Sequence, residues 1–129
     1  MKNFLKYQFP ALFWIGLIFA LISTPGSYFP EEPFDLFDKF VHMFLFGTVT
    51  YLVYRAFQYQ EKSFFLKNFS IGFAFLVCVI YGIVSEIYQE YVPGRSSDVT
   101  DALANMFGGG IVSLYVLYFN YIKTKRGKI

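Results

Sequence analysis

Four long stretches of uncharged, mainly apolar residues dominate this chain of 129 residues. They cover residues 7–30, 40–54, 68–85 and 102–122, and they are 24, 15, 18 and 21 residues long. A helix needs about 20 apolar residues to span a bilayer, and charged residues flanking a shorter stretch can lie in the interface. The sequence therefore predicts an all-α integral membrane bundle of four transmembrane helices, at about 7–24, 37–57, 68–90 and 98–122, in one domain covering 1–129.

The composition excludes the other classes of fold. Hydrophobic residues make up 56% of the chain and charged residues 16%, whereas soluble domains carry about 25% charged residues. Disorder requires low hydrophobicity, and a disulfide scaffold requires more cysteines than Cys78 alone. A signal peptide is an alternative interpretation of the first stretch, but residues 24–27 form a poor cleavage site and three further apolar stretches follow.

Basic residues are unevenly distributed among the connections between these helices. Nine of the eleven lie at the N-terminus, in the second connection and in the C-terminal tail: Lys2, Lys6, Arg55, Lys62, Lys67, Lys123, Lys125, Arg126 and Lys128. The other two connections hold Lys39, Arg95 and eight of the nine acidic residues: Glu31, Glu32, Asp35, Asp38, Glu86, Glu90, Asp98 and Asp101. The positive-inside rule therefore places both termini in the cytoplasm, with residues 23–39 and 86–101 on the outer side.

The second predicted helix carries Asp38, Lys39 and His42, the only histidine of the chain. Asp38 and His42 are four residues apart, so their side chains share one helical face. A carboxylate in this position can hold the imidazole in one tautomer and prepare it for proton transfer near neutral pH. A core histidine bonded to a neighbouring helix explains the same residue equally well.

The third predicted helix presents a line of small residues that leads to a carboxylate. Ala74, Cys78 and Gly82 follow one another at intervals of four residues, and Glu86 is next on the same line. Small residues allow helices to approach closely in lipid, so we expect Glu86 and the nearby Gln89 to face the bundle interior. An exposed interfacial carboxylate is the alternative for Glu86.

The fourth predicted helix begins with a polar face formed by Asp98, Asp101 and Asn105. A helix cap explains Asp98, and the helix dipole favours Asp101 in the first turn. Asn105 lies two turns into the span and needs a partner from another helix. Arg95, just before this helix, is expected to pair with Glu86, Asp101 or Asp38. The three glycines at 108–110 indicate close helix packing.

Their predicted topology places all of these polar residues at the outer interface, although they belong to different helices. In this order and spacing they resemble the VanZ-like family of small bacterial membrane proteins, named for a protein associated with teicoplanin resistance. The resemblance covers 38–110 and rests on three short motifs: Asp38, Lys39 and His42; Glu86 and Gln89; and Arg95, Asp101, Asn105 and Gly108. Family members often carry a tyrosine where this chain has Phe46 and a glycine where it has Val112.

The resemblance implies a multi-pass protein of the bacterial inner membrane, associated with the cell envelope and in some members with glycopeptide resistance. Three interpretations of the polar cluster stay open. In a catalytic site, His42, Glu86 and Asp101 are the candidate catalytic residues; in a ligand site, Asp38, Lys39, Gln89, Arg95 and Asn105 hold an amphiphilic or lipid-linked envelope molecule; in an anchor protein, the cluster is a structural lock.

Metal and nucleic acid are both disfavoured as partners by the residue types. A metal ion on His42, Glu86 and Asp101 is an alternative, but one histidine with carboxylates is not a distinctive ligand set, so we expect no metal and no cofactor. The basic residues are dispersed along membrane boundaries, which excludes a nucleic-acid surface. The expected partner is a membrane lipid or a lipid-linked molecule, and the sequence identifies neither a protein partner nor an oligomeric state.

Overall fold

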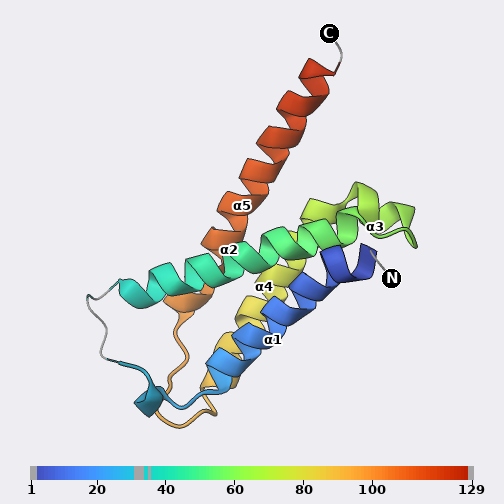
Figure 1. Ribbon diagram of the computed structural model, residues 1–129. Coiled ribbons are helices and arrows are strands. Elements are labelled where there is room, and N and C mark those ends of the chain that lie inside the picture. Colours follow the sequence, from blue (N-terminus) through green and yellow to red (C-terminus); the bar gives the residue numbers. More distant parts are fainter. Residues whose placement is uncertain (1–2, 31–33, 35, 128–129) are drawn as a thin grey trace.

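The computed structural model describes residues 3–30, 34 and 36–127 (Figure 1). Predictions that rest on Lys2, Glu31, Glu32, Asp35 and Lys128 lie outside the described residues. The described chain is helical, without strands, in the order η1 (Phe4–Gln8), α1 (Phe9–Ser23), η2 (Gly26–Tyr28), α2 (Phe37–Gln58), α3 (Phe64–Asn68), α4 (Ser70–Gln89) and α5 (Val99–Arg126). Of these, η1 is a turn of π-helix continuous with α1, and η2 is a turn of 3₁₀-helix.

Four helices of the described chain are long and apolar enough to cross a membrane: Phe4–Ser23, Phe37–Gln58, Ser70–Gln89 and Val99–Arg126. The predicted all-α fold with four spanning helices is therefore confirmed. The third span begins at Ser70 rather than at 68, because the backbone leaves helical geometry at Phe69 between α3 and α4. The fourth continues past 122 to Arg126, where basic side chains in the last turn complement the helix dipole.

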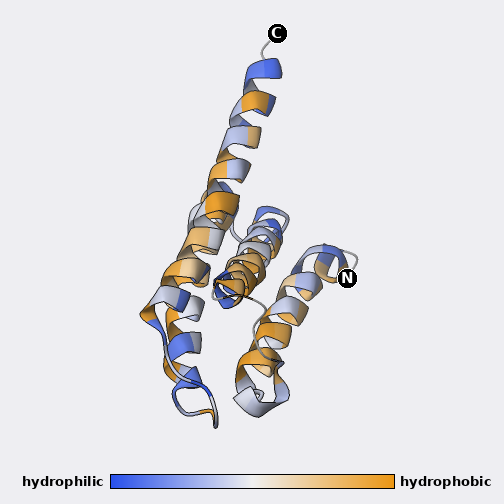
Figure 2. Ribbon diagram, turned by 90° about the vertical axis from the view of Figure 1, so that its left-hand side faces the viewer, coloured by the Kyte–Doolittle hydropathy of each residue, from blue (hydrophilic) through white to orange (hydrophobic). Residues whose placement is uncertain are grey.

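α2 lies at the centre of the bundle and packs against α5, α4 and α1. α1 contacts α2 and α4 but not α5 within the described part of the chain. The C-terminal half of α5 extends away from the other helices (Figure 1). Hydrophobic residues cover the lengths of the helices, and hydrophilic residues gather near their ends (Figure 2). This distribution matches a bundle whose outer surface faces lipid.

Glycines bring the backbones of α2, α4 and α5 into direct contact. A Cβ atom on Gly108 would lie 2.2 Å from the carbonyl oxygen of Met43, and one on Gly109 would lie 2.5 Å from Sγ of Cys78. On α4, a Cβ atom on Gly82 would come within 3.1 Å of Cβ of Asn105. The close packing predicted for residues 108–110 is thus present at Gly108 and Gly109, whereas the nearest atom to a Cβ on Gly110 is 3.9 Å away.

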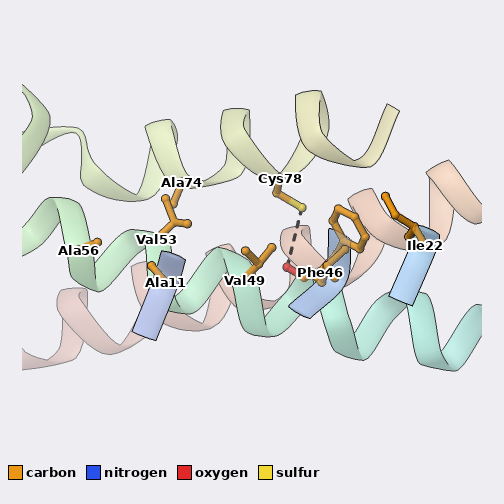
Figure 3. Close-up of a cluster of buried hydrophobic side chains, with 9 residues drawn as sticks. Ala11, Ile22, Phe46, Val49, Val53, Ala56, Ala74 and Cys78 are labelled. Carbon is orange, nitrogen blue, oxygen red and sulfur yellow. Dashed lines mark hydrogen bonds between the residues drawn. The ribbon is translucent and has the colours of Figure 1, made fainter. Parts of the chain in front are cut away.

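A small apolar core fills the space between α1, α2 and α4 (Figure 3). Val49 and Val53 of α2 lie beside Ala74 and Cys78 of α4, and the thiol of Cys78 donates to the carbonyl oxygen of Phe46 at 3.9 Å. Cys78 thereby sits as a small buried side chain on the line Ala74, Cys78, Gly82 and Glu86, all four of which are buried. The prediction that this line of α4 faces the bundle interior is therefore confirmed.

The two connections at the polar end of the bundle are bonded to each other. The N–H of Gly26, between α1 and α2, donates to the carbonyl oxygen of Pro93, between α4 and α5, at 3.0 Å. Gly94 has φ of 73°, a backbone conformation that favours glycine. At the other end, Asn3 donates to Glu61 and Asn120 donates to Tyr54. The described chain ends therefore lie at the end of the bundle opposite to these two connections.

Candidate functional site

His42 is the centre of a polar cluster that α2, α4 and α5 form together. Its Nδ1–H donates to Oδ1 of Asn105 at 2.9 Å, because an amide oxygen can only accept. The same nitrogen lies 3.6 Å from Oε1 of Glu86. On the other side of the ring, Nε2 lies 3.6 Å from Oδ1 of Asp38 and 3.9 Å from Oδ2 of Asp101. Four predicted site residues thus surround one imidazole.

Lys39 neutralises part of the negative charge in this cluster. Its Nζ lies 3.0 Å from Oδ2 of Asp98 and also bonds Oδ1 of Asp101. The lysine therefore ties the first turn of α2 to the first turn of α5. From the sequence, we expected Lys39 in the site and explained Asp98 as a helix cap. Asp98 performs both functions, since its side chain also accepts from the N–H of Thr100 at 2.7 Å.

The charge on Asp98 is stabilised by these contacts. Its bonds to the backbone N–H and the hydroxyl of Thr100, followed by the bond to Lys39, lower the pKa of the Asp98 carboxyl to about 2. Asp98 lies just before α5 and is half exposed at its side chain, so water remains in contact with it. The Asp98 carboxylate is therefore ionised at neutral pH.

Three buried polar atoms of the cluster lack a hydrogen-bond partner among the described residues. They are Oε1 of Glu86, Oε1 of Gln89 and Nδ2 of Asn105. Glu86 is only 3% exposed, Gln89 4% and Asn105 0%. The other Glu86 oxygen accepts from the N–H of Asp98 at 3.4 Å. An unpaired polar group in a dry interior is costly, so these three atoms require a polar partner, such as water or a ligand, beyond the described side chains.

A cavity of about 480 Å³ adjoins the cluster between α1 and α2. Its polar lining consists of Asp38, His42, Gln89 and Arg95. Its apolar lining is larger and comes from α1, α2 and the connection between them: Ile18, Leu21, Ile22, Phe29, Pro30, Phe37, Val41, Leu45 and Phe46. The cavity therefore offers an apolar wall on one side and ionisable groups on the other, as an amphiphilic ligand requires.

The predicted ion pair between Arg95 and a carboxylate is wrong. The guanidinium instead donates from Nε to the carbonyl oxygen of Thr24 at 3.4 Å and from Nη2 to that of Leu21 at 3.3 Å. It also stacks over the ring of Phe29, with Cζ 4.2 Å from the centroid. These carbonyls belong to the C-terminal end of α1, where the helix dipole favours a cation, so Arg95 caps α1 while Lys39 pairs with the carboxylates.

The two departures from the family pattern, Phe46 and Val112, leave the set of ionisable groups intact. Phe46 is 1% exposed and packs against Tyr81, with ring centroids 5.6 Å apart. Val112 lies one turn beyond Gly108, beside Gly47 of α2.

Phe29 is a site residue that sequence reasoning missed, although an aromatic side chain shortly after a span is a signal for cation stacking.

The fold and the cluster define a four-span integral membrane protein with a buried ionisable centre. The sequence model of the VanZ/LLP1 family matches residues 2–120. The chain therefore belongs to the VanZ/LLP1 family, which confirms the predicted resemblance.

One curated relative is an uncharacterised protein of the fission yeast Schizosaccharomyces pombe. It is 27% identical over 106 residues, which cover 81% of this chain and 62% of the relative. The chain thus spans less than two thirds of the length of that protein. No solved structure matches the chain. The yeast relative shows that similarity extends beyond the bacteria, so the predicted bacterial origin does not follow from the family.

Proposed function

We propose that this protein binds the polar headgroup of an amphiphilic molecule at the cluster around His42, with the apolar part of that molecule in the adjoining cavity. The observation that carries the proposal is the pair of unsatisfied buried oxygens, on Glu86 and Gln89, beside a cavity whose lining is mainly apolar. A headgroup that donates hydrogen bonds or carries a bound cation would satisfy these oxygens.

The positive-inside distribution supports an orientation for this site. The described basic residues at the opposite end of the bundle include Lys6, Arg55, Lys62, Lys67 and the cluster Lys123, Lys125 and Arg126. Both chain ends then lie in the cytoplasm, and the polar cluster faces the outer side. In a bacterial cell this is the periplasmic side of the inner membrane, where lipid-linked envelope molecules are found.

The ligand class that we propose is broader than the glycopeptide-resistance role seen in some family members. Membranes of bacteria and of yeast share amphiphiles with polar headgroups, and a relative from yeast favours a ligand of that shared kind. A link to teicoplanin resistance is the narrower form of the same proposal. Proton transfer by His42, oriented by Asp101 or Glu86, is its catalytic form and stays a prediction.

Lipid retention by variants of the cavity tests the proposal. We would reconstitute the protein in nanodiscs with phosphatidylglycerol and phosphatidylcholine and count retained lipids by native mass spectrometry. Leu21→Trp places a large ring in the cavity and is expected to abolish retention. Phe13→Trp, on an exposed position of the same helix, is the matched control and should retain lipid. Equal retention by both variants would contradict the proposal.

A structural lock is the second candidate function, and the bonds from Lys39 to Asp98 and Asp101 favour it. These bonds join α2 to α5 whether or not a ligand is present. In that case Gln89→Leu, which removes an unpaired oxygen, should leave folding unchanged and Lys39→Met should prevent assembly. Normal assembly of Lys39→Met would argue against the lock.

A further inference from the structure

Three potential metal ligands face one another at the edge of the cavity. Asp38, His42 and Asp101 each offer one ligand atom, and these atoms all lie within 4.8 Å of one another. Nε2 of His42 is 3.6 Å from the Asp38 oxygen and 3.9 Å from the Asp101 oxygen. Ligand atoms about 2.05 Å from a tetrahedral metal ion are about 3.3 Å apart, so small side-chain rotations would close this set around an ion.

The imidazole already has the orientation that a metal ligand needs. Because Nδ1–H donates to Asn105, the neutral ring carries its proton on Nδ1 and leaves the lone pair of Nε2 free. That lone pair lies on the side of Asp38 and Asp101. Histidines that bind metal almost always donate their other N–H to an oxygen in this way, which fixes both tautomer and ring orientation. Asn105 therefore acts as a positioning residue.

The charges around the ring favour a cation. The carboxylates of Asp38, Glu86 and Asp101 lie beside the imidazole of His42. Asp98 joins them through Lys39 and through its N–H, which donates to Glu86. Lys39 is the single basic partner that the structure describes for these carboxylates. Lys39 bonds Oδ1 of Asp101 and leaves Oδ2 facing the imidazole. A cation bound among carboxylates in such excess over basic partners would stabilise their ionised forms.

Two buried oxygens near these ligand atoms, on Glu86 and Gln89, have no partner among the described residues, and Gln89 shares the cavity with Asp38 and His42. Oε1 of Glu86 has no hydrogen-bond partner among residues 3–30, 34 and 36–127, its side chain is 5% exposed, and it points at the His42 ring at 3.6 Å. Oε1 of Gln89 is equally unpaired and lines the cavity together with Asp38 and His42. Water bound to a metal ion at Asp38 and His42 would lie in the cavity that Gln89 lines and would supply a donor for the Gln89 oxygen.

We propose that Nε2 of His42 and the carboxylates of Asp38 and Asp101 bind a divalent transition-metal ion. One imidazole nitrogen with two carboxylate oxygens suits Zn²⁺ or Mn²⁺ better than Mg²⁺ or Ca²⁺, which prefer oxygen alone. Three protein ligands leave a coordination position for water or an anionic headgroup, and Asp38 and His42 direct it towards the cavity. The sequence led us to expect no metal, and its alternative ligand set contained Glu86 instead of Asp38, but Glu86 lies on the Nδ1 side of the ring.

Metal binding by the whole chain in detergent tests this assignment. The protein is stripped with EDTA, freed of chelator and titrated with ZnCl₂ by calorimetry and with CoCl₂, whose absorption bands report nitrogen and oxygen ligation. We expect one ion per chain. Asn105→Leu removes the hydrogen-bond partner of His42 and should weaken metal binding about 10–100-fold. Asp38→Asn and His42→Gln each remove a ligand atom, so they should weaken metal binding at least about tenfold.

Two variants keep the result interpretable. Asp38 is a third exposed at its side chain in the first turn of α2, so Asp38→Asn should fold even if His42→Gln does not. Glu90→Gln removes an exposed carboxylate at the same end of the bundle and should bind as the unchanged protein does. Absence of stoichiometric binding, or equal affinity for Asp38→Asn and Glu90→Gln, would overturn the assignment.

The metal titration is independent of the proposed lipid ligand. It uses Zn²⁺ or Co²⁺ alone, with no lipid added, and Leu21→Trp should bind the ion normally because that side chain contributes no ligand atom. One-to-one metal binding without lipid retention would reject the proposed function and support the metal site. Lipid retention in EDTA by a chain that binds no ion would do the opposite.

Discussion

Asn105 on α5 accepts a hydrogen bond from Nδ1 of His42 on α2 at 2.9 Å, between two fully or nearly fully buried side chains. This bond is a direct interhelical connection in the middle of the ionisable cluster. Its partners are 63 residues apart in the sequence. Helix pairing, rather than local sequence, therefore determines the orientation of the only histidine.

A double-mutant cycle of His42→Gln and Asn105→Leu should show a coupling of about 0.6–1.7 kcal/mol in the free energy of unfolding, the range for interhelical hydrogen bonds in membranes. Unfolding in mixed detergent micelles provides the measurement. Asn120→Ala is the control, because Asn120 is exposed and its bond to Tyr54 is long, at 3.4 Å. Strictly additive effects of the two buried substitutions would show that the bond contributes nothing.

Two adjacent glycines of α5 should respond oppositely to alanine. A Cβ atom on Gly109 would lie 2.5 Å from Sγ of Cys78 and 2.9 Å from Oγ1 of Thr50, so Gly109→Ala should destabilise the bundle by about 1–3 kcal/mol. Gly110 has its nearest neighbour at 3.9 Å, and Gly110→Ala should be neutral or stabilising by up to about 1 kcal/mol. Thermal unfolding in detergent compares the pair, and equal shifts would contradict the packing.

The stability of the bundle should decrease between about pH 4 and pH 2 through Asp98. Its bonds to Thr100 and Lys39 lower the pKa to about 2 from the ordinary value of 3.8. A carboxyl group whose pKa is lower in the folded state stabilises the fold above its unfolded pKa, and that stabilisation is lost as the pH falls through the folded pKa.

Thermal unfolding as a function of pH checks this expectation with Asp98→Asn as the comparison. Asparagine preserves the helix cap but removes the charge that pairs with Lys39. The variant should be less stable than the unchanged chain at pH 7, and the two should converge near pH 2. A difference that persists unchanged at pH 2 would assign the effect to the cap rather than to the charge.

Arg95→Gln should destabilise the connection between α4 and α5 by about 1–2 kcal/mol, because it removes the cation that caps α1 and stacks on Phe29. Arg95→Lys should recover little of this loss, since an ammonium lacks the planar fork that reaches both carbonyls. Unfolding free energies of the two variants, each combined with Glu86→Gln, provide the test. The effects of the Arg95 and Glu86 substitutions on the unfolding free energy should be additive. Strong coupling between them would support the ion pair that the sequence suggested.

Most of the fold was predictable because membrane insertion leaves clear marks in the sequence. The uncharged stretch from 102 to 122 predicted the span of α5, and the small-residue line through Cys78 predicted the buried face of α4. The geometry of Arg95 was not predictable, because its partners are backbone carbonyls of Leu21 and Thr24, more than seventy residues earlier. Carbonyls are present at every position and leave no signature in the sequence.

The sequence predicted which residues form the polar cluster, but not which of them pair with one another. Depth along the membrane brought Asp38, His42, Glu86 and Asp101 to one level, and that argument requires only the lengths of the spans. Which oxygen faces which ring nitrogen depends on helix rotation, which the close contacts of Gly82, Gly108 and Gly109 restrict. For the same reason Lys39, rather than Arg95, emerged as the partner of Asp98 and Asp101.

The cavity has two walls of different origin, since α1 supplies Ile18, Leu21 and Ile22 while the imidazole and the carboxylates stand on helices fastened together by glycine contacts. Substitutions along α1 can therefore reshape the apolar side of the cavity without moving His42 or the carboxylates around it. Under the proposed function, variants that bind amphiphiles of different chain length should therefore differ first in the residues of α1, while the ionisable residues of α2, α4 and α5 stay the same.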